Sequence, residues 1–224
     1  MSRSLWLAGG LAFVFTLLAN LPAAWVLGSI AWPSGWQAEA PGGTLWKGRL
    51  RRLGPLGPLA WQVSPWRGHL QVEGAFQQQA WTLRASGWPW NWQARLSPGA
   101  AAVGAAGDYL IDGRWQGELR LAGQGGRCLH AEGQLQASQV AMLTPWNLAL
   151  GDVRVTPSCA AGLQLLAHIQ RAGEHRIEAR LELASHRLRL DGQVQADAAL
   201  LPPLAQAGWV KPGSTVLAAQ LRLR

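Results

Sequence analysis

Apolar and polar residues alternate with a period of two in several segments of the chain. In residues 114–121, Trp115, Gly117 and Leu119 fall on one side of an extended strand, and charged or amide side chains fall on the other. The alternation recurs in residues 70–76, 81–85, 176–183, 187–196 and 217–224. A helical period would spread the arginines around a helix, so the pattern is typical of antiparallel sheet with one face in water.

Short turn signals separate these segments, among them Gly54-Pro55, Ser97-Pro98 and Thr156-Pro157. No long helical crossover intervenes, which favours a meander over a parallel sheet. We therefore expect a mainly β fold, a curved antiparallel sheet with one or two short helices. Residues 98–107 and 197–208 are the segments that look helical or loop-like. A sheet of this length either closes, which makes its apolar face a core, or stays open, which leaves that face as a trough.

Residues 5–31 are mostly apolar, with interruptions at Asn20 and Pro22. As one helix they would extend about 40 Å, more than the bilayer hydrocarbon core of about 30 Å. We expect an uncleaved transmembrane anchor in residues 1–32 and a β-rich domain in residues 33–224. A cleaved signal peptide and a buried core helix are the alternatives. With Arg3 as the charged side chain ahead of the run, the anchor alone leaves its orientation open.

The chain carries a formal net charge of +8 and a pI near 11.1, which raises the question of a nucleic-acid partner. The placement of the charges argues against one, because most arginines alternate with apolar residues along strands. The one dense patch, Lys47, Arg49, Arg51 and Arg52, is short. We interpret the arginines as a solvated strand face, the alternative being a basic face that meets anionic lipid or an acidic partner domain.

Two cysteines, Cys128 and Cys159, lie in the expected β domain. An even pair in an exported domain most simply forms one disulfide. Two buried thiols in a cytosolic domain are the alternative. Their spacing fits no zinc motif, and we expect no metal or other cofactor.

The sequence contains no nucleophile elbow, zinc-protease helix, phosphate-binding loop or dinucleotide-binding glycine fingerprint. The five histidines are scattered, and His175 and His186 are expected on solvated strand faces. We therefore expect that the protein is not an enzyme.

Tryptophan is unusually frequent, with 14 residues against 3 Phe and 1 Tyr. Trp81, Trp88, Trp90 and Trp92 lie close together in the sequence. Such rings could form a polysaccharide or lipid site. They could equally fill a thin β core or lie near a membrane interface, where indole rings are favoured.

Three segments together resemble the type II secretion system protein N family: residues 21–26, 43–48 and 59–66. The motif residues are Gly43, Leu45, Trp46, Gly48, Trp61, Pro65 and Trp66. The glycine–leucine–tryptophan pattern also occurs in AsmA-like envelope proteins, to which the family is similar in its strand-rich part. We expect these motif residues, Trp46 and Trp66 in particular, to be structural.

The resemblance implies a single-pass protein of the cell inner membrane with its C-terminal domain in the periplasm. It implies an accessory component of the type II secretion system, which exports folded periplasmic proteins across the outer membrane, with other inner-membrane secretion components as partners. It supplies no catalytic residues. The alternative function is an AsmA-like lipid-binding or lipid-transfer module that uses the apolar side of an open sheet.

Overall fold

A computed structural model of the chain describes residues 3–33, 35–101, 110–144, 146–211 and 213–222. These residues contain three α-helices and one 3₁₀ helix: α1 (Arg3–Ala19), α2 (Ala23–Ser29), η1 (Pro65–Arg67) and α3 (Leu201–Gln206). The first strands are short: β1 (Ala38–Glu39), β2 (Gly42–Gly43), β3 (Lys47–Leu50), β4 (Arg52–Leu53), β5 (Leu59–Ser64) and β6 (His69–Phe76). Longer ones follow: β7 (Gln79–Trp88), β8 (Asn91–Ala101), β9 (Leu110–Gln124), β10 (Arg127–Thr144), β11 (Leu148–Ser158), β12 (Gln164–Arg171), β13 (His175–Glu182), β14 (Arg187–Val194) and β15 (Val216–Arg222).

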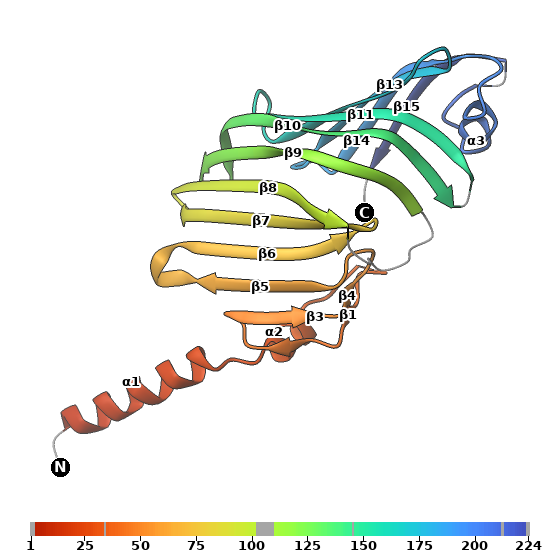
Figure 1. Ribbon diagram of the computed structural model, residues 1–224. Helices are drawn as coiled ribbons and strands as arrows, with labels where there is room; N and C mark the ends of the chain where they lie inside the picture. The colour runs from red at the N-terminus through yellow and green to blue at the C-terminus, as the bar shows by residue number, and fades with distance from the viewer. Residues whose placement is uncertain (1–2, 34, 102–109, 145, 212, 223–224) are drawn as a thin grey trace.

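Thirteen of these strands form a single sheet in which every strand pairs only with its neighbours in this sheet along the chain. The pairs are antiparallel throughout, and β1 and β4 form a separate two-stranded sheet. The large sheet is strongly curved in Figure 1. It is also open, with β2 at one edge and β15 at the other. The predicted mainly β fold with a curved antiparallel sheet is therefore confirmed, and the alternative of a closed barrel is excluded.

Strand register brings the apolar residues of successive strands into rows on one face. Trp61, Val72, Leu83, Leu96 and Leu119 are direct cross-strand neighbours from β5 to β9. We call the side of the sheet that carries this row the apolar face. Because side chains alternate along a strand, the charged and amide residues between them lie on the opposite side, the wet face.

The same apolar face continues through the C-terminal strands, where Val153, Ile169 and Ile177 form a row from β11 to β13. Here it is covered. The segment with α3 contributes Leu204 and Val210 to a core shared with strand residues such as Ile177 and Leu217, the last of which is only 1% exposed. Figure 1 shows α3 at this end of the sheet. The row from Trp61 to Leu96 is only half-buried, since the described clusters of buried core residues include none from β5, β7 or β8.

The apolar N-terminal run differs from the expected single helix. α1 ends at Ala19 and α2 begins at Ala23, after Pro22, which has no backbone N–H and disfavours a helical conformation in the residue before it. Among the described residues, no helix is both long enough and apolar enough to cross a membrane. The apolar run over residues 5–31 is therefore divided between two helices, where a single helix was expected.

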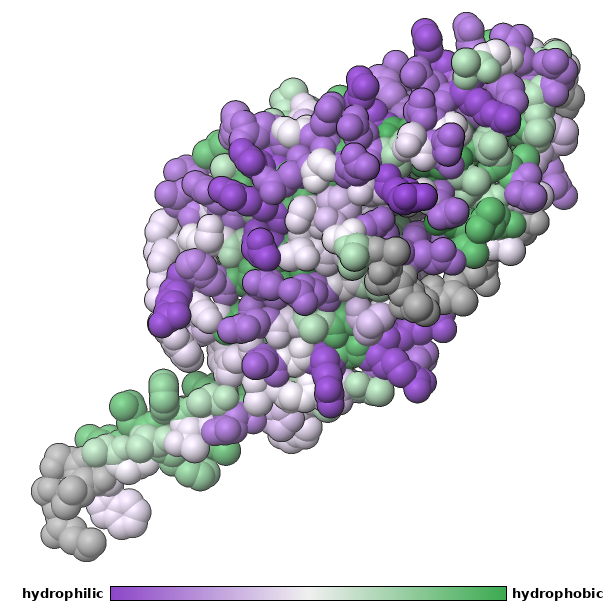
Figure 2. Space-filling model, in the orientation of Figure 1, coloured by the Kyte–Doolittle hydropathy of each residue, from purple (hydrophilic) through white to green (hydrophobic). Residues whose placement is uncertain are grey.

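α1 is nevertheless a strongly apolar helix without a packing partner along its length. Its described side chains are exposed, with Trp6, Leu7 and Leu11 each at least 75% accessible. Figure 2 shows it as a mostly hydrophobic projection from a body whose visible surface is largely hydrophilic.

The two segments predicted to be helical or loop-like have different outcomes. Residues 197–208 contain α3, as expected. Residues 98–101 instead complete β8, and residues 102–107 lie outside the described part of the chain. Pro98 pairs with Trp81 of β7 in a part of β8 beyond its last pair with β9, and proline is tolerated in such an edge position.

Cys128 and Cys159 form the predicted disulfide, with 5.3 Å between their Cα atoms. Cys128 is the second residue of β10, and Cys159 follows the last residue of β11. The disulfide therefore links two neighbouring strands where their backbone pairing has ended.

We predict that Cys128→Ala/Cys159→Ala lowers the free energy of unfolding by about 3–4 kcal/mol, because a cross-link closing a loop of this length restricts the unfolded chain. Chemical denaturation of the two proteins measures the difference. Reductant should lower the stability of the natural chain to that of the variant and leave the variant unchanged. Equal stability with and without the disulfide would contradict the prediction.

Candidate functional site

The family-like motif forms the junction between the N-terminal helices and the sheet. Gly43 ends β2 with a φ of +84°, and a Cβ atom there would lie 2.4 Å from the Lys47 carbonyl oxygen. A glycine is therefore required at this tight connection between β2 and β3.

Gly48 is required for a different reason, since it lies under the indole of Trp61. A Cβ atom on Gly48 would be 2.2 Å from the Trp61 ring. The close approach lets Trp61 Nε1 donate a hydrogen bond of 2.9 Å to the Leu45 carbonyl oxygen. One glycine and one tryptophan on adjacent strands thus fix the conformation of the β2–β3 turn.

Leu45 and Trp46 then attach this turn to the N-terminal segment. Trp46 Nε1 donates to the Leu18 carbonyl oxygen of α1 at 2.8 Å, and the Leu45 amide donates to the Leu21 carbonyl oxygen at 2.9 Å. Leu18 lies in the last turn of α1, and Leu21 lies in the connection between α1 and α2. Carbonyl groups at the end of a helix have no i+4 amide within the helix and are free to accept bonds from elsewhere. We call these two bonds, with the Trp61–Gly48 contact, the helix clamp.

Pro65 and Trp66, the last motif residues, lie in η1 between β5 and β6. The Pro65 carbonyl oxygen accepts a hydrogen bond from the Gly68 amide at 3.1 Å. The Trp66 side chain, however, is 69% exposed, which differs from the expectation of a packed structural ring. The ring lies on a turn beyond the paired strands, where the sheet has no second layer to cover it.

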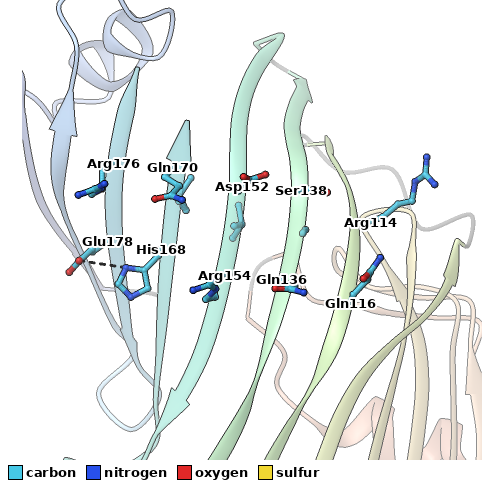
Figure 3. Close-up of a pocket in the computed structure, with 13 residues that line it drawn as sticks. Arg114, Gln116, Gln136, Ser138, Asp152, Arg154, His168, Gln170, Arg176 and Glu178 are labelled. Carbon is cyan, nitrogen blue, oxygen red and sulfur yellow. Dashed lines mark ion pairs between the residues drawn. The ribbon is translucent and has the colours of Figure 1, made fainter. Parts of the chain in front are cut away.

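A polar hollow of about 620 Å³ lies on the wet face across β9 to β13. Its side chains form two adjacent cross-strand rows (Figure 3). One row is Gln116, Gln136, Arg154, His168 and Glu178. Arg114, Ser138, Asp152, Gln170 and Arg176 form the other.

A β-bulge in β10 lies beside the hollow. The register of β10 shifts after Ser138, where Gln139 has a φ of +54° and its amide donates to Asp152. Bulges bend a strand and increase its local twist, which accounts for a depression at this point of the face.

Three arginines outnumber the two carboxylates of Asp152 and Glu178, so the hollow carries a small excess of positive charge. His168 Nδ1 and Glu178 are 3.5 Å apart, whereas Arg114, Arg154 and Arg176 form no ion pair among the described residues. Unpaired guanidinium groups on a surface suit carboxylate or phosphate groups of a partner. The sequence did not single out this hollow, because its residues come from five strands whose mutual register was unknown.

Elsewhere on the wet face, arginines form ion pairs with acidic residues of the same strand. Arg120 hydrogen-bonds Glu118, and that bond holds the pKa of the Glu118 carboxyl below its usual value. Arg189 Nε lies 2.8 Å from Asp191. Both pairs are solvent-exposed, so each contributes little to stability.

The histidines form no cluster with cysteines or acids that could hold a metal ion in the part of the chain described. His175 differs from its expected solvated position: it is only 6% exposed, and its Nε2 lies 3.0 Å from the Leu150 carbonyl oxygen. His175 pairs with Val194, and Ile177, two residues later on β13, pairs with Gly192. His175 and Ile177 therefore lie on the same side of β13, which is the apolar face.

We predict that Trp46→Phe loosens α1 from the sheet, because it removes the hydrogen bond to Leu18 and keeps a ring. One hydrogen bond contributes roughly 1 kcal/mol, so limited proteolysis between residues 19 and 36 should become about fivefold faster. Trp81→Phe is the matched control, since Trp81 also donates to a backbone carbonyl but lies in the sheet. Equal cleavage of both variants would disprove the helix clamp.

The family model of type II secretion system (T2SS) protein N matches the chain over residues 34–208. This range contains the described strands from β1 to β14, α3 and all seven motif residues. Comparison with curated proteins and with solved structures gives no significant match. Since the family model covers well over half of the 224 residues, the chain belongs to the type II secretion system protein N family.

Proposed function

We propose that the protein is an accessory inner-membrane component of the type II secretion system that supports export of folded periplasmic proteins across the outer membrane. Membership of the protein N family supports the assignment to this system. The Cys128–Cys159 disulfide supports a periplasmic place for the sheet, because disulfides persist in oxidising compartments.

The observation that carries the membrane placement is the exposed apolar surface of α1. An apolar helix with no covering layer is unfavourable in water, and lipid acyl chains would cover it. The helix clamp then holds the sheet close to the bilayer surface. In this arrangement the N-terminus lies on the cytoplasmic side, and the C-terminal domain is in the periplasm.

The protein acts through contacts and without catalysis of its own. The polar hollow on the wet face is the proposed contact for another inner-membrane component. Arg114, Arg154 and Arg176 would pair there with an acidic surface of that component, and the bulge in β10 gives the contact its shape.

We predict that Arg154→Glu/Arg176→Glu in the full chain reduces co-purification with the other inner-membrane secretion components at least tenfold. Groups of opposite charge attract one another across an interface, and they repel when the sign of the charge on one side is reversed. Export of a secreted protein in cells carrying the variant measures the functional consequence.

Arg84→Glu/Arg95→Glu is the matched control, because these exposed arginines lie on the wet face at β7 and β8, outside the hollow. Equal losses in both variants would reject the hollow as the contact. Unchanged export after removal of the whole protein would reject the accessory role itself.

The apolar face favours a second candidate function, binding of lipid. Its row from Trp61 to Leu96 is half-buried, and α3 covers only the C-terminal strands. Acyl chains lying across β5 to β8 would cover the rest. Since the open sheet leaves this face accessible over β5 to β8, the arrangement fits an AsmA-like lipid-binding module.

We predict for this candidate that the full chain purified from the envelope carries a phospholipid mass in native mass spectrometry. Leu83→Gln/Leu96→Gln should reduce lipid occupancy at least fivefold with little change in melting temperature, because both side chains are only partly buried. Thr82→Gln/Ser97→Gln changes their wet-face neighbours on the same strands and should leave occupancy unchanged. An unliganded natural chain would eliminate this candidate.

A further inference from the structure

Three exposed tryptophans of the sheet lie at one of its two ends. Trp66 is 69% exposed in η1, Trp88 is 46% exposed at the end of β7, and Trp90 is 67% exposed in the turn to β8. The Trp88 and Trp90 rings stack with centroids 5.4 Å apart and planes within 2°. These three side chains form what we call the tryptophan rim.

Backbone hydrogen bonds tie the turns of the tryptophan rim to one another. The Gly87 amide donates to the Gly68 carbonyl oxygen at 2.9 Å, which joins the Trp66 turn to the Trp88 turn. The Gly125 amide donates to the Pro89 carbonyl oxygen at 2.6 Å, which joins the next turn. Trp92 Nε1 donates to the Gly125 carbonyl oxygen at 2.9 Å. The exposed rings are therefore presented by a fixed scaffold.

Other tryptophans of the sheet are used differently. Trp61 is held over Gly48, and the Trp81 and Trp115 rings lie 6.0 Å apart on the half-buried apolar face. Among the tryptophans on the strands and turns of the large sheet, high exposure is thus a property of the rim. Leu129 and Leu183, at the same end, are also exposed.

Exposed basic residues lie at the same end of the sheet as the tryptophan rim. Lys47, Arg127 and Arg187 are the first residues of β3, β10 and β14, and Arg67 lies beside Trp66. Glu182 also lies at this end, where Ser185 donates a hydrogen bond to it. At the opposite end the β6–β7 turn carries Gln77 and Gln78. The basic residues Arg51 and Arg171 at that end are ion-paired, with Glu39 and Glu174.

The tryptophan rim lies at the same end of the sheet as α1. The helix clamp holds the end of α1 at the β2–β3 turn, which is on this side of the sheet. In Figure 1 the β5–β6 and β7–β8 turns lie at the left, and α1 projects beyond them to the lower left. A membrane that surrounds α1 would therefore meet these turns.

We propose that the tryptophan rim lies in the interfacial region of an anionic phospholipid bilayer, so that the sheet stands end-on to the membrane. Indole rings favour this interface, where one edge is apolar and the other is wet. Basic side chains beside an anionic leaflet are attracted to its negative surface charge. This inference rests on the proposed inner-membrane placement of α1.

The test is amide hydrogen exchange of the full chain in nanodiscs of phosphatidylethanolamine and phosphatidylglycerol, compared with detergent micelles. Exchange in the turns at residues 65–68, 88–91 and 125–127 should slow at least tenfold in the nanodiscs. The opposite turns at residues 77–78 and 172–174 should not change. Trp88→Ser/Trp90→Ser should abolish the slowing, whereas Gln77→Ser/Gln78→Ser at the far end should preserve it.

Quenching of Trp6 by brominated acyl chains, obtained as the difference from Trp6→Phe, reports the placement of α1 separately. Quenched Trp6 with freely exchanging rim turns would overturn the end-on membrane contact and leave the membrane placement standing. Unquenched Trp6 would overturn the placement. Equal slowing at both ends of the sheet, or slowing of the rim turns in micelles by an added oligosaccharide, would also overturn the proposal.

Discussion

A single-layered sheet cannot bury its own apolar face, and this constraint underlies the rest of the molecule. Each inner strand of the large sheet has a ladder partner on either side, and only the edge strands β2 and β15 have one, so most of the described backbone is paired without a second sheet. The hydrophobic side chains, in contrast, need a covering layer that the sheet itself does not supply. The α3 segment covers the C-terminal strands, whereas the face of β5 to β8 is left half-buried.

The helix clamp gives the apolar N-terminal helix a defined relation to the sheet. Trp46 reaches across 28 residues of sequence to a carbonyl oxygen near the end of α1, and Gly48 provides the space in which Trp61 fixes the intervening turn. The motif that identifies the family by resemblance is therefore mainly a junction. Its structural purpose explains why it combines small residues with large aromatic ones.

Much of this architecture could be predicted from sequence because strand periodicity is local. Apolar and polar side chains alternate in residues 114–121, and this segment pairs in register with β10. Cys128 and Cys159 form the disulfide that an exported domain would suggest. Trp66 could not be placed, because its exposure depends on whether another layer lies above η1. The polar hollow depends on a bulge and on five strands in register. The break between α1 and α2 was signalled by Pro22, but continuous hydrophobicity outweighed that signal in our interpretation.

The strictly sequential strand order also affects how the chain can acquire its structure. Each new strand needs only the hairpin that precedes it, so loop closure is short at nearly every step. The sheet can therefore form progressively from its N-terminal edge, adding one strand at a time. The segment that carries α3 lies before the final strand, so the C-terminal core would be the last part to be completed.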